Sequence, residues 1–245
     1  NIHPMTGDPG EESLRIPYAG LPSGPNFGNV VHDLLESLPF SELQGPSTHQ
    51  VDITTICRKY GIELDVSLLL EMLQTVVATP LMASTKEFVD TPTLAMVDER
   101  QCVKEMGFYF HLARGSTTDI NRMLADVETV GLVNERNISG YLTGFIDLVF
   151  SYDNKFYIVD YKTNNLGDTA DSYKRENLVN AMASHNYGLQ YYLYTLVIHR
   201  YLENVLAEYD YDTDFGGIFY LFVRGMGDGD RGVFYDKPER GKLLE

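Results

Sequence analysis

Two apolar runs separated by a short polar break constrain the fold of this chain more than any other feature. The runs lie between residues 139 and 164, and the break ends at Asp153-Asn154. Apolar runs with a turn-forming dipeptide between them are typical of a β-hairpin. Asp and Asn both tolerate the positive φ that a two-residue hairpin turn requires. We therefore predict two antiparallel strands joined by a two-residue turn.

This turn places Asp147 on the first strand directly opposite Asp160 on the second. Side chains that lie opposite each other share a face, with Cβ atoms about 5 Å apart. Lys162 lies two residues beyond Asp160 and shares that face as well. The other strand positions are apolar on both faces: Phe145, Val149, Phe156 and Ile158 on one, and Ile146, Leu148, Phe150, Tyr157, Val159 and Tyr161 on the other. We therefore expect the hairpin to be buried on both sides.

Two carboxylates that face each other on a buried hairpin repel each other and lose hydration. Lys162 offsets only part of the charge of Asp147 and Asp160, so the pattern predicts a bound divalent cation. Carboxylate oxygens suit Mg²⁺, with Mn²⁺ as a substitute. The alternative is a hairpin whose polar ends reach solvent, with both carboxylates simply hydrated. A longer loop would break the register on which the prediction depends.

The chain is strongly acidic, with 35 Asp and Glu against 19 Lys and Arg and a formal charge of −16. This charge argues against a freestanding protein that grips nucleic acid by non-specific electrostatics. It leaves open a nuclease whose DNA is delivered by something else. The acidic residues are spread along the sequence, so we expect most of them on a solvated surface.

The two cysteines, Cys57 and Cys102, are too few for a disulfide framework or for a four-cysteine iron–sulfur cluster. A reducing compartment is therefore expected, and we predict a cytoplasmic location with no membrane partner. The sequence shows no signal-peptide pattern and no apolar stretch long enough to span a membrane. Because the first residue is Asn1, we expect a piece of a longer protein.

Residues 1–25 are rich in Pro, Gly and Ser, which predicts a linker or arm from an upstream domain, followed by one domain over 26–245. Asn26 is a candidate cap for the first helix. Apolar periodicity predicts helices over 29–38, 52–60, 65–78, 117–130, 172–184 and 187–209, of which the pair near 50–80 would be a helical insertion. Alternation predicts strands over 103–112, 218–223 and 232–235 beside the hairpin at 138–163. This order predicts an α/β fold with a mixed sheet and helices packed on it.

Two metal-binding carboxylates followed by a lysine suit the hydrolysis of a phosphodiester. Lys162 could orient the attacking water, help remove its proton or stabilise the developing charge, and the residues leave these three roles open. Asp147 followed by Asp160-Tyr161-Lys162 matches the pattern of the PD-(D/E)xK nucleases. The surrounding sequence at 144–149, 159–164, 187–194, 215–225 and 27–36 resembles the C-terminal nuclease domain of the RecB family of helicase–nucleases.

This resemblance implies a restriction-endonuclease-like fold, with a mixed sheet flanked by helices, and a role for each matching residue. His32 matches the metal-binding histidine, Asp147 and Asp160 match the metal carboxylates, and the carbonyl of Tyr161 matches a backbone ligand. Lys162 matches the catalytic lysine. Without the resemblance, a single histidine on an apolar helix is more often structural than a metal ligand.

Gln190 and Tyr194 match a QxxxY motif that contacts DNA, and Glu105 matches an acidic residue on the preceding strand. Gln190 and Tyr194 lie four residues apart and share a helical face, which also fits ordinary packing. Glu105 fits a plain strand carboxylate equally well. Four basic residues are candidate phosphate contacts or solvated surface: Lys174, Arg175, Arg224 and Arg231.

The resemblance implies Mg²⁺-dependent hydrolysis of DNA, mainly single-stranded, during double-strand-end processing and recombinational repair. It also implies a helicase domain in the same polypeptide and partners resembling RecC and RecD. Two alternatives stay open at this point. One is a catalytically inactive module that binds DNA or supports the complex, and the other is a freestanding nuclease.

Overall fold

The predicted hairpin is present, with the predicted turn and register. The computed structural model describes residues 14–45, 50–82, 92–116, 137–185, 187–227 and 229–243. Strands β2 (Asn137–Tyr152) and β3 (Lys155–Lys162) pair antiparallel, with Tyr152 opposite Lys155 and Leu148 opposite Val159. Asp153 and Asn154 have φ values of 48° and 58°, as a two-residue hairpin turn requires.

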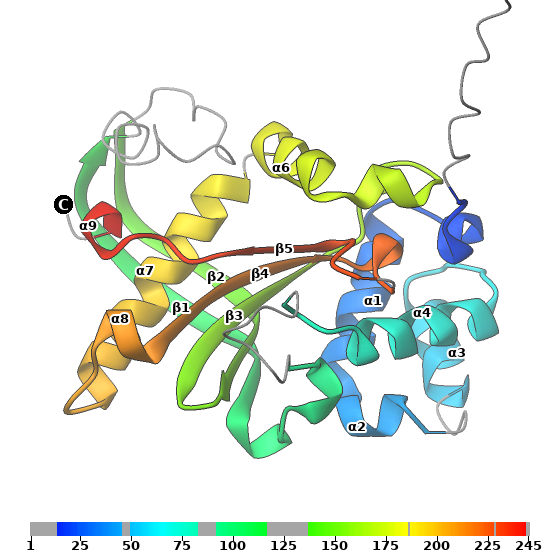
Figure 1. The fold of residues 1–245 in the computed structure, drawn as a ribbon, viewed down its shortest axis with the longest axis horizontal. Helices are drawn as coiled ribbons and strands as arrows, with labels where there is room; N and C mark the ends of the chain where they lie inside the picture. The colour runs from blue at the N-terminus through cyan, green and yellow to red at the C-terminus, as the bar shows by residue number, and fades with distance from the viewer. Residues whose placement is uncertain are drawn as a thin grey trace, which may run out of the picture.

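The hairpin is the centre of a five-stranded sheet with the order β1-β2-β3-β4-β5 (Figure 1). Strand β1 (Cys102–Ser116) pairs antiparallel with β2, and β4 (Phe215–Phe222) pairs parallel with β3. Strand β5 (Val233–Asp236) closes the other edge, antiparallel to β4. The sheet is therefore mixed, as predicted, and β3 is buried between β2 and β4.

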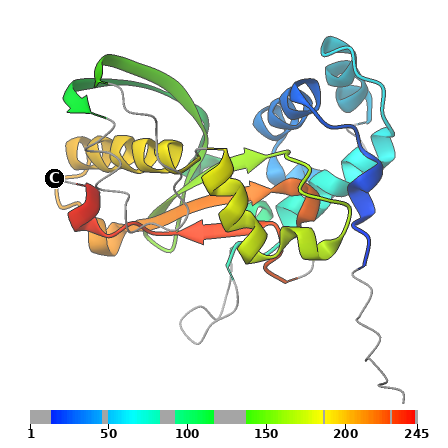
Figure 2. The ribbon, with the colours of Figure 1, turned by 90° about the horizontal axis from the view of Figure 1, so that it is seen from above.

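Helices cover both faces of the sheet (Figures 1 and 2). One face packs against α1 (Pro25–Ser37), α2 (Phe40–Leu43), α3 (Gln50–Lys59) and α4 (Val66–Ala78). The other face packs against α6 (Arg175–Ser184) and α7 (Tyr187–Val205), with the short α8 (Tyr211–Asp214) and α9 (Arg240–Leu243) near the end of the chain. Short 3₁₀ turns complete the described structure: η1 (Pro17–Gly20), η2 (Leu94–Met96), η3 (Glu99–Gln101), η4 (Ala170–Tyr173) and η5 (Val223–Gly225).

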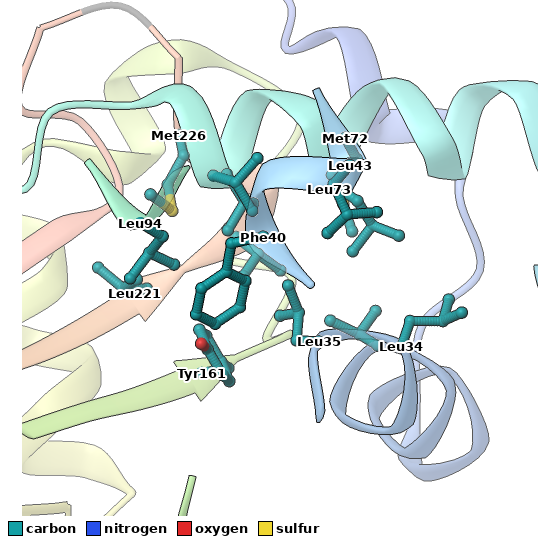
Figure 3. Close-up of a cluster of buried hydrophobic side chains, with 14 of the residues drawn as sticks. Leu34, Leu35, Phe40, Leu43, Met72, Leu73, Leu94, Tyr161, Leu221 and Met226 are labelled. Carbon is teal, nitrogen blue, oxygen red and sulfur yellow. The ribbon is translucent and has the colours of Figure 1, made fainter. Parts of the chain in front are cut away.

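The two layers of helices enclose two separate apolar clusters on opposite faces of the sheet. Figure 3 shows the first, where Phe40 lies between the strand residue Tyr161 and the helical residues Leu35 and Leu73. All of these side chains are buried. The helices at 50–78 therefore share a core with the sheet instead of standing apart from it. Among the described residues, no helix is both long and apolar enough to cross a membrane.

Several predicted helix ends differ from the observed ones. Helix α1 begins at Pro25 after Gly24, and Asn26 does not cap it: its amide nitrogen donates to the carbonyl of Tyr60 instead, at 3.1 Å. Helix α4 has Asp65 as its cap, whose carboxylate accepts from two backbone amides at 2.9 and 3.1 Å. The helix predicted over 117–130 lies outside the described residues.

The segment before α1 packs against the body from Ile16 onwards. Ile16, Tyr18 and Leu21 are buried, and the Tyr18 hydroxyl lies 2.6 Å from that of Thr75 on α4. Arg15 forms an isolated β-bridge with Thr169. The linker predicted over 1–25 thus extends at most to the residues before this packed segment.

Candidate active site

The site begins where the β2–β3 ladder ends. The last regular pair is Leu148 with Val159, so Asp147 and Asp160 lie at the next position. Asp147 turns its side chain toward the neighbouring strand, and its Oδ2 accepts a hydrogen bond from the backbone amide of Tyr161 at 2.7 Å. A carboxylate thus replaces a backbone acceptor at this point, which fixes Asp147 against β3.

A chain of hydrogen bonds joins β3 to helix α7. Gln190 donates from Nε2 to Asp160 Oδ1 at 2.8 Å and accepts from Lys162 Nζ at its Oε1 at 3.0 Å. Gln190 Nε2 also lies 2.8 Å from the hydroxyl of Tyr194, which donates to the carbonyl of Phe145 at 2.7 Å. Gln190 and Tyr194 are one helical turn apart, so a single face of α7 reaches both strands of the hairpin.

Lys162 is held on several sides. Its ammonium forms an ion pair with Asp160 Oδ2, and Nζ lies 4.0 Å from the ring centroid of Tyr187 and 5.4 Å from that of Tyr220. The side chain is only 12% exposed. Cation–π contacts with two rings restrict the motion of the ammonium. Tyr187 is not among the predicted site residues, although its spacing of three residues from Gln190 places it on the same helical face.

Helix α1 brings His32 to the hairpin from the other face of the sheet. The apolar stripe that includes Val31 and Leu35 is buried, while His32 lies at its edge and remains partly exposed. His32 Nδ1 lies 3.4 Å from Asp147 Oδ1. Gly28, one turn earlier, lets the helix approach β3: a Cβ there would lie 3.2 Å from Thr163 Oγ1.

Glu105 on β1 completes the cluster. It has a φ of 49°, which L-residues rarely adopt, and it lies opposite Asp147 where the ladder omits a pair between Lys104–Leu148 and Met106–Ile146. His32, Glu105 and Asp147 each offer a ligand atom, and these atoms lie within 4.8 Å of one another. Glu105, which the sequence matched only weakly to this site, therefore belongs to the same cluster as His32.

Burial and the repulsion of neighbouring charges raise the pKa values of Asp160 and Glu105. The pKa of Asp160 is raised by burial and then by the charge of Asp147, while Lys162 opposes this shift. Burial and the charge of Asp147 also raise the pKa of Glu105. Burial would lower the pKa of His32, but the hydrogen bond and charge of Asp147 outweigh it and raise that pKa. The site therefore has excess negative charge for a cation to offset.

The residues present fit a divalent cation. Asp160 Oδ2 is buried without a hydrogen bond among the described residues and has only its ion pair with Lys162. Glu105 and Asp147 supply further carboxylate oxygens, and His32 an imidazole nitrogen. This set of mainly hard oxygen donors is the type that Mg²⁺ and Mn²⁺ accept.

The structure thus brings together the acidic, amide, hydroxyl, imidazole and lysine side chains that the sequence singled out. The basic candidates have other partners: Lys174 pairs with Asp171, and Arg175 lies over the ring of Phe234. Arg224 is 1% exposed, and its guanidinium donates to the carbonyls of Thr163, Leu21 and Pro22, which excludes it as a phosphate contact on the surface. It stacks over Phe27 with 4.6 Å from Cζ to the ring centroid. Arg224 is therefore a structural link between the end of β3 and the segment before α1.

A hairpin with two carboxylates and a lysine, in a mixed sheet between helices, defines the class of this protein. Residues 11–243 match the family described as the PD-(D/E)XK nuclease superfamily. Because this match covers almost the whole chain, the protein belongs to that superfamily. The fold that the resemblance implied is confirmed.

The relatives are RecB subunits of RecBCD enzymes. The subunit from Haemophilus influenzae is 38% identical over 233 residues, which are 92% of this chain and 18% of that protein. The Escherichia coli K12 subunit is 33% identical over 244 residues, 95% of this chain and 20% of that protein. The Mycobacterium tuberculosis H37Rv subunit is 32% identical over 245 residues, 87% of this chain and 22% of that protein. The chain therefore spans about a fifth of the length of these relatives.

Proposed function

We propose that this chain is a metal-dependent deoxyribonuclease domain that hydrolyses phosphodiester bonds of DNA. The observation that carries the proposal is the convergence of Asp147, Asp160, Lys162 and His32 at one end of the central hairpin. The match to RecB subunits supports DNA as the substrate. The intact set of polar side chains argues against the alternative of an inactive module.

The cluster of His32, Glu105 and Asp147 would hold a Mg²⁺ ion, or Mn²⁺ in its place, together with Asp160 and the carbonyl of Tyr161. When bound, a divalent cation neutralises charge on the phosphate and favours deprotonation of water. The carboxylates would determine where the scissile phosphate binds, because they determine where the cation is held. Water remains accessible through the partly exposed side of His32.

Lys162 is the catalytic residue in this proposal, because its ammonium can reach a phosphate oxygen or the attacking water. Gln190 and Tyr194 act as positioning residues. Their polar groups are occupied by Asp160, Lys162 and the carbonyl of Phe145, which favours a supporting role over a direct contact with DNA. Their hydrogen bonds keep the lysine beside the carboxylates before substrate arrives.

The match to RecB subunits supports a further proposal about the wider setting. We propose that the chain works within a longer polypeptide with a helicase domain, beside subunits that resemble RecC and RecD, in the cytoplasm. Its substrate would be mainly single-stranded DNA produced during double-strand-end processing and recombinational repair. The net charge of −16 supports delivery of DNA by another part of such a complex.

The direct test incubates the chain with labelled single-stranded and double-stranded DNA in Mg²⁺, Mn²⁺ or EDTA. Asp160→Ala and Lys162→Ala should each lower metal-dependent cutting by about 100-fold or more. Glu63→Gln, an exposed carboxylate, and Lys155→Ala, at the other end of β3, are matched controls that should cut normally. Full activity in either site variant would disprove the mechanism.

A chain that does not cut at all calls for a second measurement. Mn²⁺ titration of the wild-type chain and of Asp147→Ala distinguishes a nuclease that is silent without its motor from an inactive module. Binding that the variant loses supports the first reading. Absence of Mn²⁺ binding by the wild-type chain contradicts the proposal.

A further inference from the structure

Strands β1 and β2 continue well beyond the candidate site and form an arm, defined here as residues 106–116 of β1 and 137–146 of β2. Figures 1 and 2 show this arm running over α7, away from helices α1–α4. One face of the arm is packed. Met106, Phe108 and Ile146 lie in the cluster that includes α7, and the Phe108 ring meets that of Tyr194 edge-on at 5.8 Å.

The opposite face of the arm carries three exposed rings, Tyr109, Tyr141 and Phe145, which we call the aromatic strip. Their exposed fractions are 69%, 63% and 62%. The rings of Tyr109 and Tyr141 stack on each other at 4.6 Å with an interplanar angle of 21°. Gly107 lies opposite Phe145, and a Cβ at this glycine would lie 3.4 Å from the Phe145 ring. A glycine on β1 thus lets this ring lie over the neighbouring strand.

The aromatic strip leads directly to the candidate site. Phe145 is two residues from Asp147 on the same strand, and its carbonyl accepts the hydroxyl of Tyr194. From Phe145 to Tyr141 the strand extends by about 13 Å at ~3.3 Å per residue. This length accommodates more than one base in a row.

Exposed rings in such a row require an explanation. Apolar surface is unfavourable in water, and contiguous exposed apolar patches on soluble proteins usually mark binding sites. Among the described residues, the other exposed aromatic ring is Tyr201 on α7, which lies apart from the strip in sequence and on a different element. The concentration of exposed rings beside Asp147 is therefore a property of the arm.

The composition of the two strands of the arm also suits contact with a polyanion. Its two segments contain no Asp or Glu in their sequences, in a chain that has 35 of these residues. A phosphate backbone that runs along the arm therefore meets no carboxylate of the arm itself. Aromatic rings stack on bases regardless of sequence, but only where the bases are not already stacked in a duplex.

We propose that the aromatic strip binds the bases of single-stranded DNA and guides the strand to the candidate site. This inference rests on the proposed nuclease function and adds to it a physical basis for a single-strand preference. Bases would stack on Tyr109, Tyr141 and Phe145, while the phosphates remain in water until they reach Asp147. The aromatic strip thus supplies affinity for DNA that an acidic protein cannot obtain from electrostatic attraction.

The binding test uses fluorescence anisotropy in EDTA, so that no cleavage occurs. The probes are a labelled oligothymidylate and a strand of the same length with abasic sites in place of bases. Because the rings of Tyr109 and Tyr141 stack on each other, we count them as one platform for one base. Tyr109→Ala/Tyr141→Ala should then weaken oligothymidylate binding by about 10-fold to 100-fold, the order of affinity that one stacked base contributes. Binding of the abasic strand should not change. Phe145 is left intact because its backbone is part of the site.

Two variants serve as controls. Tyr201→Ala removes an exposed ring outside the strip and should bind like wild type. Tyr109→Phe/Tyr141→Phe keeps both rings and should retain most of the affinity for oligothymidylate, which excludes a role for the hydroxyls. Thermal unfolding shows whether each variant is folded. If the double Ala variant is misfolded, the double Phe variant still reports on the strip in a folded protein.

A small chromogenic diester, bis(4-nitrophenyl) phosphate with Mn²⁺, separates this inference from the proposed function. It reaches the metal site without contacting the strip, so the strip variants should hydrolyse it normally, whereas Asp160→Ala should not. If the wild-type chain does not hydrolyse the diester, the result contradicts the nuclease function but does not affect the conclusion about DNA binding by the strip. Unchanged oligothymidylate affinity in the double Ala variant, or an equal loss on the abasic strand, would overturn the inference and assign the strip to a protein partner.

Discussion

Glu105 on β1 lies opposite Asp147 on β2, and both fall where the pairing of these strands is interrupted. Cys102, which precedes Glu105 on β1, packs in the cluster with helices α1–α4, whereas Met106, which follows it, packs in the cluster with α7. Cys102 and Met106 are four residues apart and would share a face in a regular strand. They face opposite layers because Glu105, between them, has a positive φ of 49°. The same irregularity turns the two carboxylates toward His32 and aims the aromatic strip away from α7.

The backbone at Glu105 should be strained, and its replacement by glycine should relieve that strain. A left-handed conformation costs an L-residue about 1 kcal/mol more than glycine. Glu105→Gly should therefore be about 1 kcal/mol more stable than Glu105→Ala, as measured by urea unfolding. Both variants lack the carboxylate, so each should bind Mn²⁺ about 10-fold to 100-fold more weakly than wild type.

Calorimetric Mn²⁺ titration checks the second part, with Glu63→Gln as the control for loss of an exposed carboxylate. Equal stability of the glycine and alanine variants would show that the positive φ carries no strain. Unchanged Mn²⁺ affinity in both would remove Glu105 from the cation site while leaving the other ligands in place.

Gln190 forms hydrogen bonds with both Asp160 and Lys162. Its replacement should therefore destabilise this charged pair more than it destabilises helix α7. Gln190→Leu leaves Asp160 and Lys162 each without one hydrogen-bond partner, and bonds to charged groups contribute about 1.5–3 kcal/mol. We expect a loss of about 2–4 kcal/mol in the free energy of unfolding. Tyr194→Phe removes a hydroxyl that donates to the carbonyl of Phe145 and accepts from Gln190, both uncharged partners, and should cost about 1 kcal/mol.

Tyr201→Phe on the exposed surface of α7 is the control, and it should leave stability within about 0.5 kcal/mol of wild type. Stability losses of equal size for Gln190→Leu and Tyr194→Phe would argue that Gln190 merely packs. Retention of full nuclease activity by Gln190→Leu would remove its positioning role.

The hairpin could be predicted from sequence because its determinants are local. Alternation assigns the faces, and Asp153-Asn154 selects a turn length that sets the register at Asp147 and Asp160. The approach of His32 could not be derived from periodicity alone, because it depends on where α1 docks on the sheet. The match of a longer motif supplied that information.

Other features depend on contacts between segments that are distant in sequence. Nothing in the sequence around Glu105 signals a left-handed residue, because glutamate is not a residue that favours this conformation. The sequence around Arg224 does not indicate that this residue is buried. The carbonyls that accept its hydrogen bonds lie about 60 and 200 residues earlier in the chain. Tyr187 could have been found, since it shares a helical face with Gln190.

Arg224 should be essential for stability in a way that lysine cannot replace. The guanidinium supplies donors to three carbonyls in a buried position, and the planar fork is what matches their directions. Arg224→Lys leaves at least one of these carbonyls unpaired, so we expect a loss of about 2–4 kcal/mol in urea unfolding. Arg200→Lys, on the exposed side of α7, should change stability by less than about 0.5 kcal/mol. An equally small effect at Arg224 would contradict its role as a link between β3 and the segment before α1.

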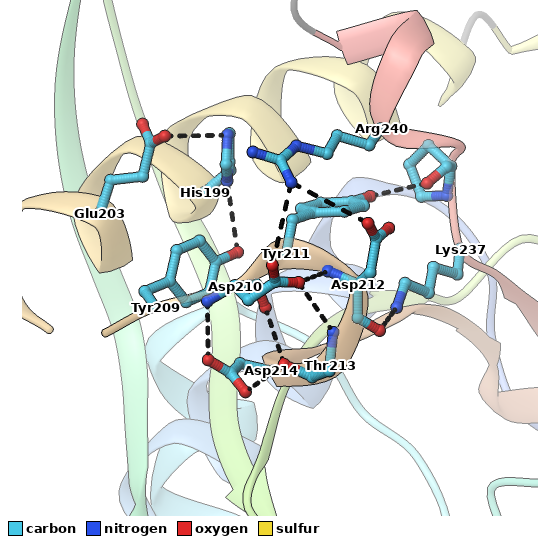
Figure 4. A network of polar contacts seen from close by, with 11 residues as sticks. His199, Glu203, Tyr209, Asp210, Tyr211, Asp212, Thr213, Asp214, Lys237 and Arg240 are labelled. Carbon is cyan, nitrogen blue, oxygen red and sulfur yellow. Dashed lines mark hydrogen bonds and ion pairs between the residues drawn. The ribbon is translucent and has the colours of Figure 1, made fainter. Parts of the chain in front are cut away.

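His199 is buried beneath a network of mostly exposed polar side chains where α7 is followed by α8 (Figure 4). Its Nδ1 lies 3.3 Å from the hydroxyl of Tyr209, and its Nε2 lies 3.5 Å from a carboxylate oxygen of Glu203. The ring of Tyr211 meets the imidazole edge-on at 5.2 Å. Burial lowers the pKa of His199, Glu203 opposes this shift, and the positive charges of Arg200 and Arg240 add to it.

Protonation of His199 should therefore destabilise the folded protein. In the unfolded chain this histidine has its ordinary pKa of 6.5, so it binds a proton more readily there than in the folded state. The contribution of the neutral imidazole is fully present above pH 6.5 and is lost as the pH falls through the lower pKa of the folded protein. The slope from one proton cannot exceed about 1.4 kcal/mol per pH unit. Raised pKa values at Asp160 and His32 act in the opposite direction in every variant, so the test compares variants. Between pH 7.5 and 5, urea unfolding of His199→Asn should lose less stability on acidification than wild type or His185→Asn, a change at an exposed histidine. Parallel curves for all three proteins would show that His199 does not contribute to the pH dependence.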